Sequence, residues 1–101
     1  MTILKNSAKE TEIITNDIFY DASTPEKFNK VVHKLKDEGY EWVGLNKNLS
    51  FSDCKKAIYG NAKLIIHAFY NTITNKKDMQ FGTKSIYQSY PQHKKIKITN
   101  I

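Results

Sequence analysis

The clearest pattern along the chain is a helical stripe of apolar residues in its second quarter. Four apolar side chains recur at i, i+3, i+4 and i+7, with lysines and acids between them. Such spacing places them on one face of an amphipathic helix. Thr24 suits the cap of this helix, Pro25 its first position, and Gly39 a left-handed stop. The pattern predicts a helix over residues 25–38. The stripe consists of Phe28, Val31, Val32 and Leu35.

Runs of β-branched and aromatic residues predict the strands. We expect strands over residues 18–21 and 40–45, the second entered directly from the helix stop. Residues 64–70 are apolar on both faces, which is typical of the centre of a sheet. Residues 79–81 are expected to return beside this central strand. Residues 94–99 alternate lysine or threonine with isoleucine, which predicts a half-buried edge strand.

The remaining segments give weaker local patterns. Ser52 is placed to cap a short helix over residues 53–59, and residues 75–78 form a polar turn. Residues 84–92 fit either a helical turn or a loop. The polar residues 1–11 are expected to form a loose N-terminal arm.

Together these elements predict an α+β fold, with one main amphipathic helix packed on a small mixed or antiparallel sheet. A chain of 101 residues can bury one core but not two, so residues 1–101 are expected to form a single domain. The core is expected to combine the helical stripe with apolar strand positions. Its predicted members are Phe28, Val31, Val32, Leu35, Trp42, Ile65, Ile66, Phe69, Ile96 and Ile98.

Charge is distributed unevenly along the chain. Residues 1–53 hold 7 lysines and 9 acids, whereas residues 54–101 hold 9 lysines and one acid, Asp78. A basic half of this kind can attract phosphates or an acidic protein, or it can simply keep the surface soluble. The chain has no arginine, the residue that grips guanine edges with a planar fork. Sequence-specific reading of DNA is therefore disfavoured, while loose attraction to phosphate is not.

Cysteine content and hydropathy indicate the compartment. Cys54 is the single cysteine, so no internal disulfide can form and a reducing environment is expected. Residues 1–9 contain no signal-peptide apolar block. The longest apolar run, residues 64–70, is interrupted by His67 and is far shorter than the ~20 residues of a membrane span. We expect a cytoplasmic protein without a membrane partner.

Local catalytic motifs are absent from the sequence. It contains no P-loop, no dinucleotide-binding glycine motif, no H-E-x-x-H and no C-x-x-C pair. Cys54 could still form a nucleophile pair with His33, His67 or His93, because such pairs meet in space. The alternative is that Cys54 is a small buried hydrophobe and His67 a packed strand residue. The histidines have no carboxylate at metal-ligand spacing. We therefore expect no enzyme, no cofactor and no metal.

Lysines and aromatic rings are interleaved in the second half. A tyrosine ring offers a flat face to a base and lysine neutralises phosphate, so the mixture suits a nucleotide-like or single-stranded ligand. A chain of this size has little room for a deep pocket, so we expect the site between subunits of a homo-oligomer. In the alternative interpretation, Tyr87 and Tyr90 close the core and the lysines are ordinary surface. The candidate ligand-binding residues are Lys76, Lys77, Lys84, Tyr87, Tyr90, His93 and Lys94.

The stretch Phe28–Gly44, FNKVVHKLKDEGYEWVG, resembles the helix–turn–strand core of small proteins encoded by phages and prophages of low-GC bacteria. In those proteins a segment like L-x-x-x-G-Y-x-W leads into a strand. This chain has Val43 before Gly44 where they often have serine. The resemblance carries no catalytic residue. It implies a small protein that binds and neutralises a host component, such as a defence protein or its nucleotide signal. The matching residues are Leu35, Gly39, Tyr40 and Trp42.

Three functions follow as expectations. The first is a non-enzymatic, phage-type binding protein that captures a phosphate-bearing, nucleotide-like ligand, such as a host immune signal, to counter host defence. The second is a protein–protein inhibitor of a host defence enzyme or nuclease, anchored by exposed aromatic residues and steered by lysines. The third is a non-specific nucleic-acid-binding protein that works through phosphate contacts.

Overall fold

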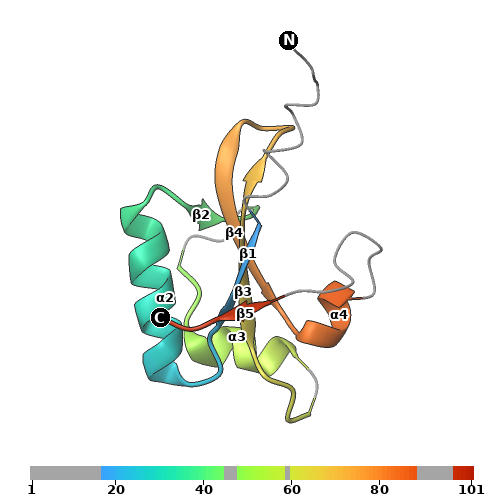
Figure 1. Cartoon of the computed structure of the whole chain (residues 1–101). Coiled ribbons are helices and arrows are strands. Elements are labelled where there is room, and N and C mark those ends of the chain that lie inside the picture. Colours follow the sequence, from blue (N-terminus) through green and yellow to red (C-terminus); the bar gives the residue numbers. More distant parts are fainter. Residues whose placement is uncertain (1–16, 45–47, 59, 89–96) are drawn as a thin grey trace.

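A computed structural model describes residues 17–44, 48–58, 60–88 and 97–101 (Figure 1). Within these ranges a five-stranded sheet has the order β2-β4-β3-β1-β5. β3 pairs antiparallel with β1 and β4, whereas β5 pairs parallel with β1 and β2 parallel with β4. The predicted α+β fold with a mixed sheet is confirmed. The elements are β1 (Ile18–Asp21), α2 (Pro25–Asp37), β2 (Glu41–Trp42), α3 (Phe51–Ala57), β3 (Ile65–Asn71), β4 (Lys76–Gly82), α4 (Lys84–Gln88) and β5 (Ile98–Thr99).

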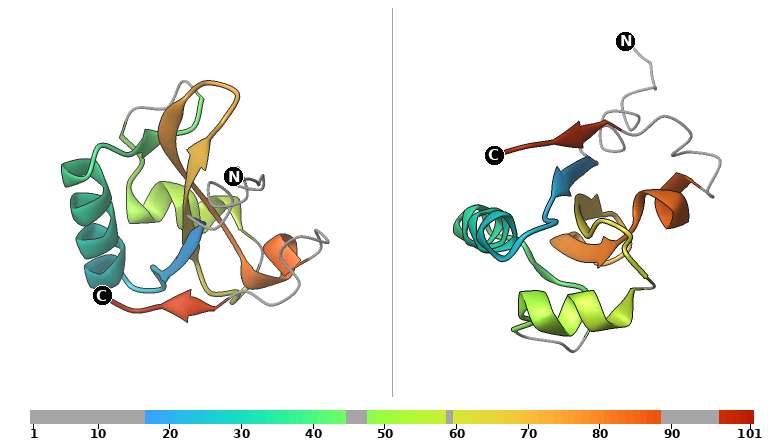
Figure 2. Two further views of the ribbon diagram at one scale, coloured as in Figure 1. Left: turned by 45° about the horizontal axis from the view of Figure 1, so that its top comes forward. Right: turned by 90° about the horizontal axis from the view of Figure 1, so that it is seen from below.

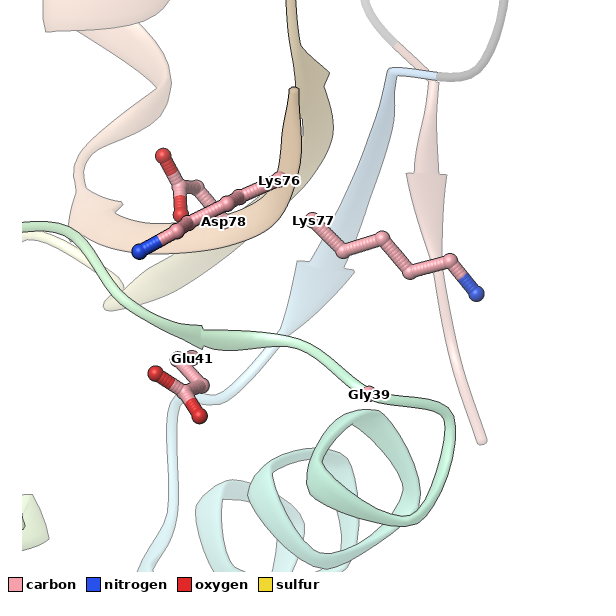
Figure 3. A pocket seen from close by; sticks show the side chains of 5 residues that line it. All are labelled: Gly39, Glu41, Lys76, Lys77 and Asp78. Atoms are coloured by element: carbon pink, nitrogen blue, oxygen red, sulfur yellow. The ribbon is translucent and has the colours of Figure 1, made fainter. Parts of the chain in front are cut away.

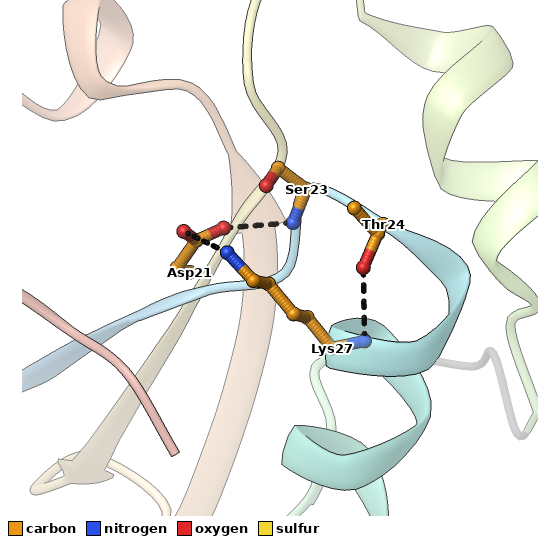
Figure 4. Close-up of polar contacts among 4 residues, drawn as sticks. All are labelled: Asp21, Ser23, Thr24 and Lys27. Carbon is orange, nitrogen blue, oxygen red and sulfur yellow. Dashed lines mark hydrogen bonds and ion pairs between the residues drawn. The ribbon is translucent and has the colours of Figure 1, made fainter.

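The main helix α2 begins at a well-formed cap. The Thr24 side chain accepts a hydrogen bond from the backbone N–H of Lys27 at 3.1 Å, and the Lys27 ammonium reaches Asp21 at the end of β1 at 3.0 Å (Figure 4). Asp21 also accepts from the N–H of Ser23 at 2.9 Å. Partial burial acts to raise the Asp21 pKa, but the bonds from Ser23 and Lys27 outweigh it, so the pKa is lowered. These contacts fix the direction in which the chain leaves the sheet.

The first core lies between the sheet and the helices α2 and α3. Phe28, Val31 and Leu35 of α2 are buried in it, which confirms the helical stripe, while Val32 is half-buried. The sheet, α3 and two connecting segments contribute the other buried residues of this core: Tyr20, Ala22, Trp42, Cys54, Leu64, Ile66, Ala68 and Met79.

The opposite face of the sheet carries a second, smaller cluster. Phe19 of β1 and Ile65 of β3 are buried there together with Tyr87 of α4, and Ile98 of β5 packs against them. α4 lies beyond the end of β4 that is remote from the β3–β4 hairpin tip (Figures 1 and 2). The predicted core member Phe69 is half-buried, as is Ile98. Ile96 and the predicted arm over residues 1–11 lie outside the described residues.

Several element bounds differ from the predictions for local reasons. The cap of α3 is Ser50, not Ser52, because Ser50 and Asp53 exchange hydrogen bonds in a capping box. β2 has two residues instead of the predicted six, and Gly44 follows with a positive φ of 86°. β4 begins at Lys76, so the predicted turn over residues 75–78 was wrong: the turn precedes Lys76 and ends at Asn75.

The central position of β3 is confirmed. It lies third in the strand order and pairs over its whole length with β4. Leu64 just before it and Ile66 within it are completely buried. None of the helices in the described ranges combines the length and the apolar character needed to cross a membrane.

Candidate binding surface

The structure does not bring the described candidate lysines together. Lys76 and Lys77 open β4, whereas Lys84 opens α4 beyond the far end of that strand. An extended stretch of this length spans roughly 20 Å. The predicted binding site of lysines and tyrosines therefore lacks support in the described residues. Tyr90, His93 and Lys94 lie outside them.

Tyr87 is part of the second core and offers no face to a ligand. Its side chain is 4% exposed, and its ring meets Phe19 edge-on at 5.0 Å and His67 at 5.2 Å. The ring also covers Gly82, where an added Cβ would lie 3.1 Å from it. The proposed stacking role for Tyr87 needs correction, because burial in the core already occupies the ring.

The candidate nucleophile pair does not form among the described residues. Cys54 is fully buried in the first core, and burial raises the pKa of its thiol to about 12. His67 lies in β3 between Ile66 and Ala68, which face that first core, so its ring points to the opposite face of the sheet. His33 is exposed on α2 beside Asp37, and His93 lies outside the described ranges.

His67 is instead a packed residue of the second face. Its ring is stacked against Phe19 at 4.4 Å and against Phe69 at 4.7 Å. Its Nδ1 lies 3.0 Å from Gln80 Nε2, and its Nε2 lies 3.6 Å from Asp17. This arrangement matches the interpretation of a packed strand residue. Within the described ranges, no group of three His, Cys, Asp or Glu side chains is placed to hold a metal ion.

A shallow pocket of about 300 Å³ lies beside the start of β4 (Figure 3). Lys76 and Asp78 lie on the same side of β4, and Glu41, which is paired with Asp78 in the strand register, lies beside them on β2. Lys77 points the other way, donates to the carbonyl of Glu38 at 2.9 Å and lies 5.6 Å from the centre of the Tyr40 ring. One ammonium beside two carboxylates does not provide the cationic cradle that a phosphate requires.

The tip of the β3–β4 hairpin is a feature that the sequence interpretation missed. Ile73 lies in the turn and is 91% exposed. Turns are normally built from glycine, proline, asparagine, aspartate and serine, and a β-branched apolar residue gains nothing from such exposure. Local folding therefore gives no reason for isoleucine at this position.

Side-chain hydrogen bonds hold this turn in one shape. Asn71 Oδ1 accepts from the N–H of Ile73 at 3.0 Å and from that of Thr74 at 3.3 Å. The N–H of Asn75 donates to the carbonyl of Asn71 at 2.7 Å, and Tyr70 donates its hydroxyl to Asn75 Oδ1 at 3.3 Å. Asn75 takes the left-handed conformation, with φ of 59°, which asparagine tolerates. The sequence N-T-I-T-N could have indicated such a turn through its flanking asparagines.

The hairpin tip thus presents one apolar side chain on a rigid support, with Lys76 and Lys77 directly behind it. Such an arrangement can fill a pocket on another molecule. No family model, curated protein or solved structure matches the chain.

Proposed function

We propose that this protein acts by binding another protein, with the tip of the β3–β4 hairpin inserted into an apolar pocket of its partner. The single observation that carries the proposal is Ile73, 91% exposed on a turn whose backbone Asn71 holds in place. Burying one isoleucine side chain contributes about 1.5–3 kcal/mol. A turn that side-chain hydrogen bonds already order loses less conformational entropy on binding than an unordered one.

Charge beside the tip supports the choice of partner. Lys76 and Lys77 follow the turn directly, and both are exposed. Lysines at the rim of an interface accelerate encounter with an acidic surface more than they add to affinity. The proposed partner therefore has an apolar pocket bordered by carboxylates.

The resemblance of Phe28–Gly44 to phage and prophage proteins suggests where this partner belongs. We propose a bacterial defence enzyme or nuclease that the protein inhibits without catalysis of its own. Capture of a nucleotide-like ligand has less support, because Tyr87 is buried and Lys84 lies far from Lys76. Non-specific binding to nucleic acid meets the same difficulty, since the described lysines do not line one groove.

Photo-crosslinking from the hairpin tip tests the proposal. Benzoylphenylalanine replaces Ile73 in one variant and Ile101 in a control, because both positions are exposed apolar residues. Each variant is irradiated in extract of a low-GC bacterium. We expect a protein adduct from position 73 alone, with wild-type protein competing and Ile73→Ser competing at least tenfold more weakly. Equal adducts from both positions, or no adduct from position 73, would contradict the proposal.

A further inference from the structure

A second surface lies on the outer edge of β4, toward the end remote from the hairpin tip. β4 has seven residues, yet β2 pairs with only two of them, Asp78 and Met79. Gly44, which follows Val43, has a positive φ of 86° and so departs from the extended conformation of a strand. The part of β4 beyond Met79 therefore has no neighbouring strand on this side within the described ranges.

The backbone of Phe81 faces this open edge. The N–H of Val43 donates to the carbonyl of Met79 at 2.9 Å, so the polar groups of Met79 point toward β2. The backbone polar groups of successive strand residues point to opposite sides. The N–H and C=O of Phe81 therefore point to the β2 side, as those of Met79 do, while those of Gln80 and Gly82 point toward β3. In the described part of the chain no residue bonds the outward N–H of Phe81. An edge of this kind is a template for an added strand.

An apolar groove of about 210 Å³ adjoins this edge. Val43, 39% exposed, lies at its rim, and Trp42 forms part of its wall. Trp42 is only 5% exposed, but its indole Nε1–H has no acceptor among the described residues. A buried donor without an acceptor is costly, so an incoming oxygen would be favoured. The lining residues are Trp42, Val43, Leu49, Met79, Gln80 and Phe81.

We propose that this edge receives an extended segment of a partner protein, which pairs with Phe81 and places an apolar side chain in the groove. One oxygen of the segment accepts the Nε1–H of Trp42. An acidic residue of the segment lies toward Lys84, which is exposed three positions after Phe81 and makes no ion pair with any described residue. Recognition by an added strand combines main-chain hydrogen bonds with one side-chain pocket in this manner.

The short length of the open edge favours a peptide segment over a second copy of the chain. If two copies paired antiparallel about Phe81, Thr83 of one would lie opposite Met79 of the other. Met79 already pairs with β2 on that side, so the copy's strand would collide with β2. A short segment that ends or diverges before Met79 avoids this overlap. The proposal does not depend on the hairpin tip, because Ile73 lies at the other end of β4.

Selection from a displayed library of random eight-residue peptides tests the inference on the full chain. We expect enriched peptides with an apolar residue followed by an acidic one. The variant Val43→Lys places an ammonium at the groove rim while keeping the N–H that bonds Met79, and should weaken binding at least tenfold. The matched control Ile73→Ser should bind the peptides as wild-type does, even if it loses the partner that the hairpin captures.

Amide NMR of the ¹⁵N-labelled protein locates the bound peptide. The sequence has a single tryptophan, so the indole Nε1–H of Trp42 gives one resonance. We expect this resonance to shift and the Phe81 amide to become at least tenfold slower in exchange with solvent. A peptide with an N-methyl group at the pairing residue should lose the protection. The Val43→Lys spectrum establishes that this variant is folded.

Other results would overturn the inference. The selection could enrich no peptide, or it could enrich basic peptides. The enriched peptides could bind Val43→Lys as well as they bind the wild-type protein, or they could bind without protecting the Phe81 amide from exchange. Protection of Phe81 that grows with protein concentration in the absence of peptide would assign the edge to a second copy instead. None of these results depends on Ile73, so they are distinguishable from failure of the hairpin proposal.

Discussion

Asn71 links the hairpin turn to the sheet by donating its side-chain amide to Asp78 Oδ2 at 2.9 Å. The same side chain accepts two backbone hydrogen bonds from the turn through its oxygen. One amide group therefore fixes both the strand pairing and the shape of the tip. Neither an aliphatic side chain nor an ionised carboxylate can do both, because the first has no polar group and the second only accepts.

Replacing Asn71 tests this double role. We expect Asn71→Leu to lower the free energy of unfolding by about 1–3 kcal/mol, because two turn N–H groups and Asp78 lose their partner. Asn71→Asp keeps an acceptor for the turn but sets a carboxylate against Asp78. Its stability deficit relative to the wild-type protein should shrink as the pH falls from 7 to about 4, because protonation removes the repulsion. Urea unfolding at several pH values measures both, and a pH-independent deficit in Asn71→Asp would contradict the assignment.

Leu35 anchors α2 to the first core, where its side chain is 1% exposed. Leu35→Ala should lower the free energy of unfolding by about 2–5 kcal/mol, since it leaves a cavity between the helix and the sheet. The half-buried Val32 on the same helix provides the control, because Val32→Ala should cost clearly less. A loss below about 1 kcal/mol for Leu35→Ala in urea unfolding would contradict this packing.

Cys54 is expected to be inert in the folded protein. Burial raises the pKa of its thiol from 9.0 to about 12, so the native thiol stays protonated where the unfolded thiol ionises. The contribution of the protonated thiol to the free energy of unfolding is fully present below pH 9. It is lost between pH 9 and about 12, because the thiol of the unfolded chain releases its proton first. Alkylation of the native protein at pH 8 should be slow and should become fast in urea. Above pH 9 the free energy of unfolding of Cys54→Ala should fall less steeply with pH than that of the wild-type protein.

Gly82 and Tyr87 are predicted to be coupled. A Cβ at position 82 would lie 3.1 Å from the Tyr87 ring, which Phe19 and His67 hold from the other side. Gly82→Ala should therefore cost about 1–3 kcal/mol in thermal or urea unfolding. In the double variant Gly82→Ala/Tyr87→Leu the total cost should be less than the sum of the two single costs. Additive costs would mean that the two positions do not interact.

The sequence by itself determined the elements whose evidence is local. The spacing of Phe28 and Leu35, the cap at Thr24 and the stop at Gly39 predicted α2 within one residue, because these signals act within a few turns of one helix. The apolar residues around Ile66 likewise predicted the central strand, since a strand covered on both faces needs apolar side chains in both directions.

Only the tertiary structure decided what each exposed or aromatic residue does. The sequence allowed Tyr87 to be a ligand platform or a core residue, and contact with Phe19 across elements selected the core. The hairpin register placed Ile73 at the tip, and the early end of β2 left Phe81 without a strand partner on its outer side among the described residues. Burial and strand pairing depend on neighbours that are distant in sequence. The spacing of apolar and polar residues along the chain indicates only which side chains of one helix or strand share a face.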